Sequence, residues 1–175
     1  MKKKFLSILS IFLIAAFLTS PVSAGPGIKL SGVQFSLGSL IASGFATGLG
    51  KTDVTVVLDA SGIPVVTCVS QGGNEAPGQN PRRVSAVGEQ TLLGSDPLRK
   101  NGRSPFLTET DDPETLPGDL AGCANSNWTG RIDFISWTDA MVSVYDTATG
   151  VLQTQQKYTC TTTRFPASVT CSLVP

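Results

Sequence analysis

The clearest regularity in this chain is an alternation of apolar and polar positions that begins at Val54. Val54, Val56 and Leu58 alternate with Thr55, Val57 and Asp59, which is the period-two pattern of a half-buried β-strand. The next four residues, Asp59-Ala60-Ser61-Gly62, have turn chemistry, because Asp favours the first position of a type I turn and Gly accepts a positive φ. A second β-rich run follows over residues 63–69. The pattern therefore predicts a β-hairpin over residues 54–69 with its turn at residues 59–62.

The same kind of pattern recurs along the rest of the chain. Further strands are predicted at residues 28–37, 40–47, 84–93, 106–108, 128–146, 151–160 and 169–174. Turns are predicted at residues 48–50 and 146–150, where Gly is frequent. No stretch sustains a period of 3.6 residues, so the sequence predicts an all-β fold.

Two long stretches lack this alternation. Residues 70–81 contain almost no apolar side chain, and residues 94–119 carry four prolines. Long irregular stretches inside a compact domain are usually functional or mobile, and a rigid sheet can present them to a partner. We therefore expect contacts with a partner in the loops of residues 70–83 and 94–119.

The first 24 residues have the composition of a signal peptide. Lys2, Lys3 and Lys4 precede an apolar run over residues 5–18, and Val22-Ser23-Ala24 is a small-residue cleavage site. The apolar run would make about 21 Å of helix, which is shorter than the roughly 30 Å core of a bilayer. This length favours a cleaved leader over an uncleaved membrane anchor. We expect export to the cell surface or the medium, a single domain over residues 25–175, and no stable membrane insertion after cleavage.

The charge balance argues against a nucleic-acid partner. The whole chain has 13 basic and 13 acidic residues, and loss of the three leader lysines would leave 10 basic residues and a net charge of −3. Proteins that bind nucleic acid usually present a basic face. A net charge of this size is ordinary for a soluble domain.

Four cysteines in an exported chain indicate two disulfides rather than reactive thiols. Three pairings are possible. We favour Cys160–Cys171, because residues 161–170 can fold as a hairpin whose strands each present one Cys. Cys68–Cys123 would then join the first predicted hairpin to the segment before Trp128.

The chain contains no histidine, which removes the Ser–His–Asp and Cys–His forms of catalysis and the commonest catalytic metal ligand. No motif predicts a cofactor or a metal site. One acidic cluster stands out, and three interpretations of it stay open: a solvated loop, which we favour, a calcium site, and a carboxylate active site. Its members are Glu109, Asp111, Asp112, Glu114 and Asp119.

A basic segment precedes the acidic cluster. Its arginines could be solvated, or they could contact an anionic polysaccharide of the cell envelope, and the candidates for such contact are Arg82, Arg83, Arg99 and Arg103. The aromatic residues Trp128, Trp137, Tyr145 and Tyr158 could form a sugar-stacking platform. In a sandwich of this size aromatic residues are more often core, which we favour.

The segment Leu58-Asp-Ala-Ser-Gly-Ile-Pro-Val65 resembles hairpins of bacterial immunoglobulin-like and fibronectin-like sandwich modules. Residues 48–53, 74–81 and 158–163 resemble segments of small exported bacterial proteins with no assigned function. The resemblance implies an antiparallel, immunoglobulin-like β-sandwich with long irregular loops. Its motifs are turn and disulfide signals, so they imply a fold and not a catalytic site.

Two functions follow as expectations. The first, which we favour, is a non-catalytic binding or structural module at the cell surface or outside the cell, whose partner is a cell-envelope component or a glycan. The second is a secreted carbohydrate-active enzyme, which would need two carboxylates roughly 5–10 Å apart across a cleft.

Overall fold

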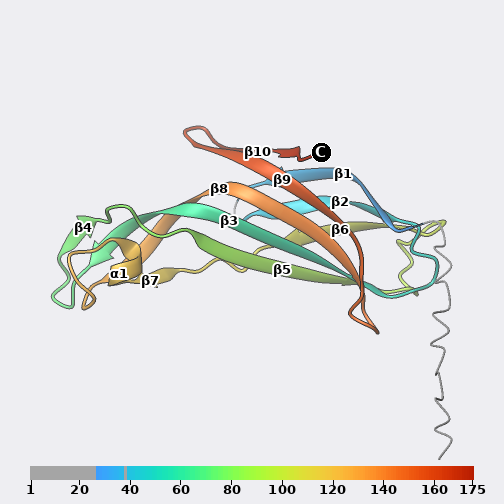
Figure 1. Cartoon of the computed structure of the whole chain (residues 1–175), viewed down its shortest axis with the longest axis horizontal. Coiled ribbons are helices and arrows are strands. Elements are labelled where there is room, and N and C mark those ends of the chain that lie inside the picture. The colour runs from blue at the N-terminus through green and yellow to red at the C-terminus, as the bar shows by residue number, and fades with distance from the viewer. Residues whose placement is uncertain (1–26, 38) are drawn as a thin grey trace, which may run out of the picture.

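The fold is described by a computed structural model over residues 27–37 and 39–175 (Figure 1). The predicted signal peptide, residues 1–24, lies outside the described residues. The elements are β1 (Lys29–Ser36), β2 (Ile41–Thr47), β3 (Val54–Val69), β4 (Glu75–Pro77), β5 (Val84–Leu92), β6 (Arg103–Glu109), β7 (Thr115–Pro117), α1 (Gly118–Ala121), β8 (Thr129–Asp146), β9 (Leu152–Arg164) and β10 (Ala167–Leu173). The predicted all-β class is confirmed.

The strands form two antiparallel sheets in a sandwich-like arrangement. The smaller sheet has the order β1-β2-β6. The larger sheet is built on the long pair β3–β8, with β5 and β4 on the other edge of β3, β9 and β7 on the other edge of β8, and β10 outside β9. Figure 1 shows the smaller sheet over only part of the larger one, whose end with β4, β7 and α1 extends beyond it.

These two parts differ enough to be named. The part where the sheets face each other is called the sandwich region. The distal region comprises residues 64–83 and 114–134, which include the far ends of β3 and β8 and the elements β4, β7 and α1.

The predicted hairpin at residues 54–69 is wrong, because β3 is one continuous strand. Each of its sixteen residues, Val54 to Val69, pairs with β8. Residues 59–62, expected as a turn, lie in the strand interior and also pair with β5 on the other edge. Bonds on both edges hold the extended backbone, so they override the local turn preference of Asp59 and Gly62. The exposed face carries Asp59, and the even-numbered positions stay buried along the whole strand.

The core lies between the two sheets in the sandwich region. Its fully buried side chains come from both sheets, with β3 and β8 supplying most of them, and include Leu40, Val54, Val56, Leu58, Trp137, Val142 and Val144. Buried and exposed positions alternate along the strands as the sequence analysis predicts, because one face of each strand is covered by the other sheet and the other face is open to solvent.

The distal region is closed without a second sheet. The short helix α1 packs against β3 and β8, and the disulfide Cys68–Cys123 ties β3 to the segment after it. Close approach requires Gly130, because a Cβ there would lie 2.2 Å from the Cβ of Ala121. Small residues and a covalent bond therefore replace the opposing sheet at this end.

The other predicted elements are largely confirmed. Both predicted disulfides form, and Cys160 lies directly opposite Cys171 in the β9–β10 hairpin. The predicted turns contain glycines with positive φ, at Gly48, Gly50 and Gly150. Both stretches predicted to be irregular have more structure than expected: β4 lies within residues 70–81, β6 and β7 lie within residues 94–119, and α1 begins at residue 118. Among the described residues, no helix has the length and apolar content needed to cross a membrane.

Candidate functional site

A polar hollow of about 440 Å³, called the acidic hollow below, opens where the smaller sheet ends above β8. One wall is the β1–β2 turn, with Leu37 and Ser39. The floor is β8, where Ile135 and Trp137 are buried. The other wall is the segment between β6 and β7. Four carboxyl-bearing residues line the hollow, Asp111, Asp112 and Glu114 from this wall and Asp133 from β8, and among the described residues no Lys or Arg lines it.

Backbone hydrogen bonds fix the acidic wall. The Asp111 N–H donates to the Val87 carbonyl of β5 at 3.0 Å, and the Ile132 N–H of β8 donates to the Glu114 carbonyl at 2.9 Å. Because β5 and β8 flank β3 on opposite edges, residues 111–114 cross the larger sheet. The wall is thus anchored at both ends, and its carboxyl groups are attached to ordered backbone.

Asp112 is the wall residue with the most perturbed environment. Thr110, which is buried, donates its hydroxyl to Asp112 Oδ1 at 2.6 Å and accepts the Leu40 N–H at 2.9 Å. Burial raises the pKa of Asp112 above its ordinary value of 3.8, the Thr110 hydrogen bond opposes this, and the charges of Glu109 and Asp111 add to the increase. Asp112 therefore holds a proton more readily than a solvated Asp.

Asp133 has the opposite environment. It is the extra residue of a β-bulge in β8, and its carboxylate accepts the Thr67 hydroxyl at 2.6 Å and the Arg131 Nε–H at 3.3 Å. The Thr67 hydrogen bond, with help from Arg131 and from the more distant charge of Arg164, lowers the pKa of Asp133 below 3.8. Asp133 is therefore held as an anion.

The structure brings together three of the five predicted acidic residues. Asp111, Asp112 and Glu114 share the hollow, whereas Glu109 ends β6 opposite Ile41 and Asp119 lies in α1. In the part of the chain that the structure describes, no group of three or more His, Cys, Asp or Glu side chains is arranged to hold a metal ion. The cluster is neither a single loop of free charges nor a ready-made cation cage.

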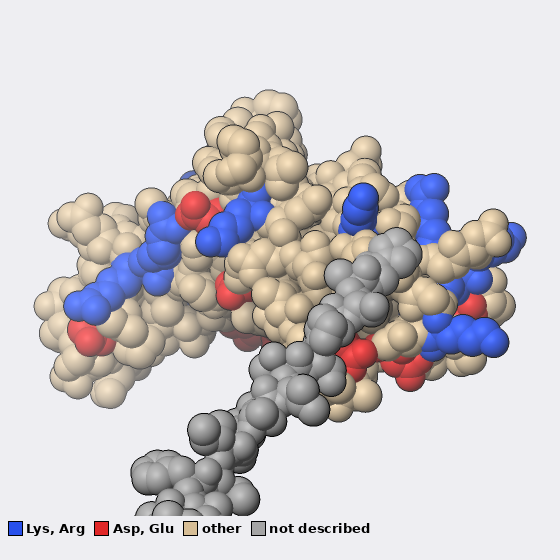
Figure 2. All heavy atoms as spheres, turned by 45° about the vertical axis from the view of Figure 1, so that its right-hand side comes forward, with Lys and Arg blue, Asp and Glu red and all other residues tan. Residues whose placement is uncertain are grey.

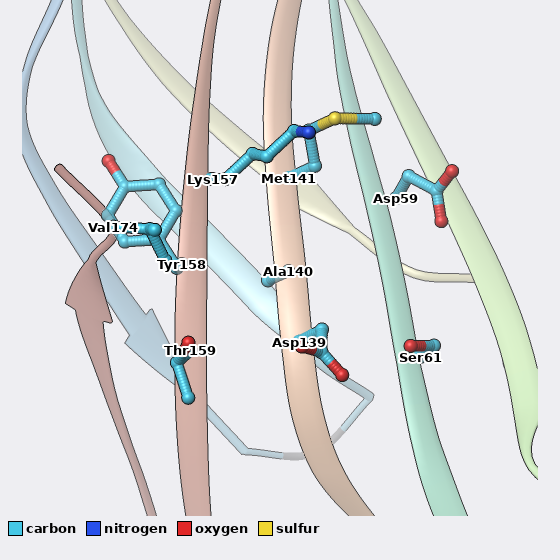
Figure 3. A pocket seen from close by; sticks show the side chains of 9 residues that line it. All are labelled: Asp59, Ser61, Asp139, Ala140, Met141, Lys157, Tyr158, Thr159 and Val174. Carbon is cyan, nitrogen blue, oxygen red and sulfur yellow. The ribbon is translucent and has the colours of Figure 1, made fainter.

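A second, shallower hollow of about 240 Å³ lies on the outer face of the larger sheet. In Figure 3, Asp59 and Ser61 extend from β3, Asp139 and Met141 from β8, and Lys157 from β9 over β8 toward Met141. This hollow carries charges of both signs, so it offers no single preference of charge to a ligand.

Asp139 is the most constrained carboxylate of the outer hollow. It accepts hydrogen bonds from the Thr138 hydroxyl at 2.7 Å and from Arg83 at 2.5 Å. These bonds lower its pKa below 3.8. Arg83 also donates to the Ser61 hydroxyl at 2.9 Å. Asp139 is paired with Arg83, as Asp133 is with Arg131. The outer hollow is in addition lined by Lys157, so it is a weaker candidate for a cation than the acidic hollow.

The four predicted contact arginines do not form one patch. Arg82 and Arg83 lie in the segment that leaves β4 for β5. Arg99 donates to the carbonyls of Thr52 and Leu92 at 2.7 and 2.9 Å, and the Arg103 guanidinium lies 3.7 Å from the Phe45 ring centre. Figure 2 shows Lys and Arg atoms in separate groups with Asp and Glu atoms among them. Arg99 and Arg103 are thus engaged in structure.

The aromatic residues do not form a platform either. Trp137 and Tyr158 are 1% and 6% exposed and belong to the core, as favoured from the sequence. The Tyr158 ring packs edge-on against Phe35 at 4.9 Å between centres. The core interpretation is wrong for the other two: Trp128 lies beside the Cys68–Cys123 disulfide, and Tyr145 lies on the outer face of β8 opposite Thr55.

The sequence analysis missed two features near the acidic hollow. Asp133 lines the hollow and is the extra residue of a bulge in β8, and no local sequence signal marks that bulge. Phe165, at the tip of the β9–β10 hairpin, is 86% exposed. The sequence does indicate this hairpin tip, because Arg164-Phe165-Pro166 interrupts two β-rich runs in a stretch without acidic residues.

Comparison with known proteins gives little guidance. No protein-family model matches this chain, and no curated protein matches it. Among solved structures it is similar to the crystal structure of Bacteroides uniformis β-glucuronidase, at 12% identity and a TM-score of 0.29, over 77% of this chain. The matched part is 12% of the length of that chain. A likeness this weak carries no argument about function.

Proposed function

We propose that this chain is an exported bacterial, non-catalytic binding module with an immunoglobulin-like sandwich, and that the acidic hollow receives a cationic group of its partner. The observation that carries the proposal is the hollow itself: of the residues that the structure describes, four carboxyl-bearing ones and no basic one line this cavity. Concave sites with a few convergent polar groups are the usual binding sites of a fold. The two disulfides are compatible with export.

The electrostatics of the hollow fit binding of a cation. Desolvation raises the pKa of Asp112, and a cation placed beside it would offset that cost by favouring the carboxylate. Asp111 and Glu114 are exposed and attached to the anchored wall segment. A guanidinium or ammonium group could therefore be held from one side while an attached apolar group contacts half-buried Leu37 and Ile132.

Benzamidine is a suitable probe, because it joins a cation to a flat apolar ring. We expect it to shift the backbone NMR signals of residues 110–114 and 132–137, with an affinity of roughly 1 mM. Benzamide, which has the same shape without the charge, should not bind. Asp111→Asn with Glu114→Gln should weaken benzamidine binding, whereas Asp119→Asn, which changes a carboxyl group in α1 outside the hollow, should not. Equal shifts with benzamide, or none with benzamidine, would contradict the proposal.

A second candidate, a secreted carbohydrate-active enzyme, is favoured by one observation. Asp112 and Asp133 line the same hollow and have pKa values displaced in opposite directions. Such a displacement is how a general acid and an anionic partner are distinguished in a two-carboxylate site. Hydrolysis of a neutral or anionic polysaccharide by the purified protein, abolished by both Asp112→Asn and Asp133→Asn, would replace the binding module by this enzyme.

The predicted glycan contact of the arginines stays a prediction, restricted now to the segment between β4 and β5. Arg82 is exposed, and Arg83 is half exposed beside Asp139. We expect Arg82→Ala with Arg83→Ala to weaken binding to anionic glycans on an array. Unchanged array signals would remove these residues from the proposed contact surface.

A further inference from the structure

The β9–β10 hairpin presents an exposed aromatic side chain on a rigid arm. Phe165, at its tip, is 86% exposed, more than any other large apolar side chain of the described residues. The Arg164 guanidinium lies 5.5 Å from the Phe165 ring centre. Exposed aromatic and Arg side chains are the residues that most often dominate a protein interface.

Several bonds hold this arm in shape. The disulfide Cys160–Cys171 links its two strands, which pair from Tyr158 opposite Leu173 to Arg164 opposite Ala167. Near the tip, the Thr163 and Ser168 hydroxyls lie 2.6 Å apart. The hairpin rises clear of the rest of the molecule at the top of Figure 1. Phe165 would therefore lose little conformational freedom when it binds.

The charge of the arm complements the acidic hollow. From Thr147 to Pro175 the only charged side chains are Lys157 and Arg164, both positive. Within residues 27–37 and 39–175, the hollow is lined by four carboxyl-bearing residues and by no basic residue. A cation with an adjacent apolar ring, which is the ligand chemistry that the proposed function requires, is thus present in this chain.

Arm and hollow adjoin on one side of the molecule. The Thr162 hydroxyl of β9 donates to the Trp137 carbonyl at 2.9 Å, and Trp137 is part of the hollow floor. The charge of Arg164 contributes to the lowered pKa of Asp133. Nevertheless Phe165 is exposed, so the tip does not fill the hollow of its own chain.

We propose that a second copy of this chain is the occupant of the acidic hollow. Two copies related by a two-fold axis would each place Arg164 and Phe165 against the other's Asp111, Asp112 and Glu114. Because arm and hollow adjoin, one two-fold axis allows both contacts at once, as a self-complementary dimer interface requires. This inference rests on the proposed function, since it names the cationic partner of the same hollow.

The test is a charge exchange followed by analytical ultracentrifugation. We expect the purified protein to reach twice its monomer mass as its concentration rises, and no more. Arg164→Glu alone, and Asp111→Lys with Glu114→Lys, should each weaken dimerisation by at least about tenfold. An equimolar mixture of the two variants should restore dimers. In the mixed dimer the tip that carries Arg164→Glu in the first variant meets the basic hollow of the second, and the unchanged Arg164 tip of the second meets the acidic hollow of the first.

Two controls make the result specific. Lys157→Glu changes the other cation of the same hairpin, which lies at the outer hollow, and should leave dimerisation unchanged. Phe165→Ser should weaken dimerisation without changing the melting temperature, because Phe165 is exposed. If Asp111→Lys with Glu114→Lys failed to fold, Asp111→Lys alone would serve in the mixture.

Each other outcome overturns the inference. A protein that stays monomeric at about 1 mM, or dimers that the charge changes leave intact, would exclude this interface. Phe165-dependent binding to vesicles of phosphatidylserine and phosphatidylcholine by a monomeric protein would assign the tip to a membrane surface. If a monomeric protein still bound benzamidine through Asp111 and Glu114, the proposed function would stand, but a second copy of the chain would not be the partner. If the protein neither dimerised nor bound benzamidine, the proposed function would be excluded as well.

Discussion

The strand β3 passes through two regions that are stabilised in different ways. In the sandwich region its buried face, which includes Val56 and Leu58, packs against a second sheet and is 0% exposed. In the distal region the same face continues as Val66 and Cys68, but the element packed against it is the four-residue helix α1. Here close-approaching glycines and the Cys68–Cys123 disulfide take the place of large apolar side chains.

The difference shows what limits each region. Burial of large apolar groups provides most of the stability of a core, whereas a region of small residues has little apolar area to bury. A disulfide stabilises such a region mainly by restricting its unfolded chain. The acidic hollow lies at the boundary, where the smaller sheet ends and the larger one continues. An open cavity at this point is a consequence of the two sheets having unequal length.

The largest expected effect comes from the sandwich region. Leu58→Ala removes a fully buried side chain of the core between the two sheets and should destabilise the protein by about 2–5 kcal/mol, because the cavity cannot be refilled. Chemical denaturation measures this loss. We expect Leu98→Ala, at a side chain that is 65% exposed, to change stability little. A small loss at Leu58 would mean that the sheets do not form the main core.

Removal of the Cys68–Cys123 disulfide should reduce stability by less than Leu58→Ala does, and its effect should be confined to the distal region. Cys68→Ala with Cys123→Ala should reduce stability by about 2–4 kcal/mol. Hydrogen exchange should become faster at residues 66–69 and 129–132 before it does in the sandwich region. Removal of the other disulfide, by Cys160→Ala with Cys171→Ala, should speed exchange in β9 and β10 instead. Uniform acceleration over the whole chain would show that the two regions unfold together.

At the junction of the regions, Gly62 is required for space rather than for backbone conformation. A Cβ there would lie 2.6 Å from the Ser136 carbonyl oxygen and 2.7 Å from Ile135 Cγ2, so Gly62→Val should cost about 1–3 kcal/mol in thermal or chemical unfolding. Gly150 differs, because its φ is 69° and a Cβ would meet no atom within 4 Å. Asn tolerates positive φ, so Gly150→Asn should be nearly harmless while Gly62→Asn should not.

The predicted contact arginines should differ in their contribution to stability, because some are bonded to the fold and others are exposed. Arg99→Ala removes two hydrogen bonds to backbone carbonyls and should lower stability by about 1.5–3 kcal/mol. Arg82→Ala should change it by less than about 0.5 kcal/mol, since Arg82 is exposed. Differential scanning calorimetry of the two variants measures the difference. Equal melting temperatures would mean that the carbonyl contacts of Arg99 are not maintained in solution.

The smallest effect concerns the boundary hollow and depends on pH. The pKa of Asp112 is raised in the folded protein, so its charge opposes folding at neutral pH, and stability is gained as pH falls through that pKa. Asp112→Asn keeps an acceptor for Thr110 and should therefore unfold at a slightly higher temperature at pH 7. The advantage should disappear as pH falls toward 3.8.

Asp146→Asn supplies a control of opposite sign. Hydrogen bonds from Thr149 lower the pKa of Asp146, so its contribution to stability is present above pH 3.8 and is lost as pH falls through the lowered pKa. This variant should be less stable than the parent at pH 7 and equal to it in strong acid. If both variants changed stability at pH 7 in the same direction, the environments assigned to Asp112 and Asp146 would be contradicted.

The strands that the sequence predicted well are those with one covered face and a clear turn at their ends. Residues 84–92 and 152–160 pair as expected, because alternation and a glycine turn are local properties. The error at residues 59–62 arose because local turn preference was weighed without long-range pairing. A signal was present, since Ala60, Gly62, Pro64, Val66 and Cys68 continue the parity of Val54 and Leu58 through the supposed turn.

The candidate site was only partly predictable. Asp111, Asp112 and Glu114 were singled out as acidic, but their placement depends on the hydrogen bonds of Asp111 to β5 and of β8 to Glu114. Glu109 and Asp119 were indistinguishable from them in sequence and lie elsewhere. Four arginines with the same charge likewise have different partners, because each partner comes from a distant segment of the chain.

The sequence by itself determined the all-β class, the turns at Gly48 and Gly150, and the favoured pairing of the four cysteines, since each depends on local pattern or on a short hairpin. Only the tertiary structure decided that β3 is one strand, that β8 bulges at Asp133 and Thr138, and that the acidic wall crosses the sheet. These features depend on hydrogen bonds and packing between segments far apart in the chain, whose combined free energy exceeds the preference of any single turn residue.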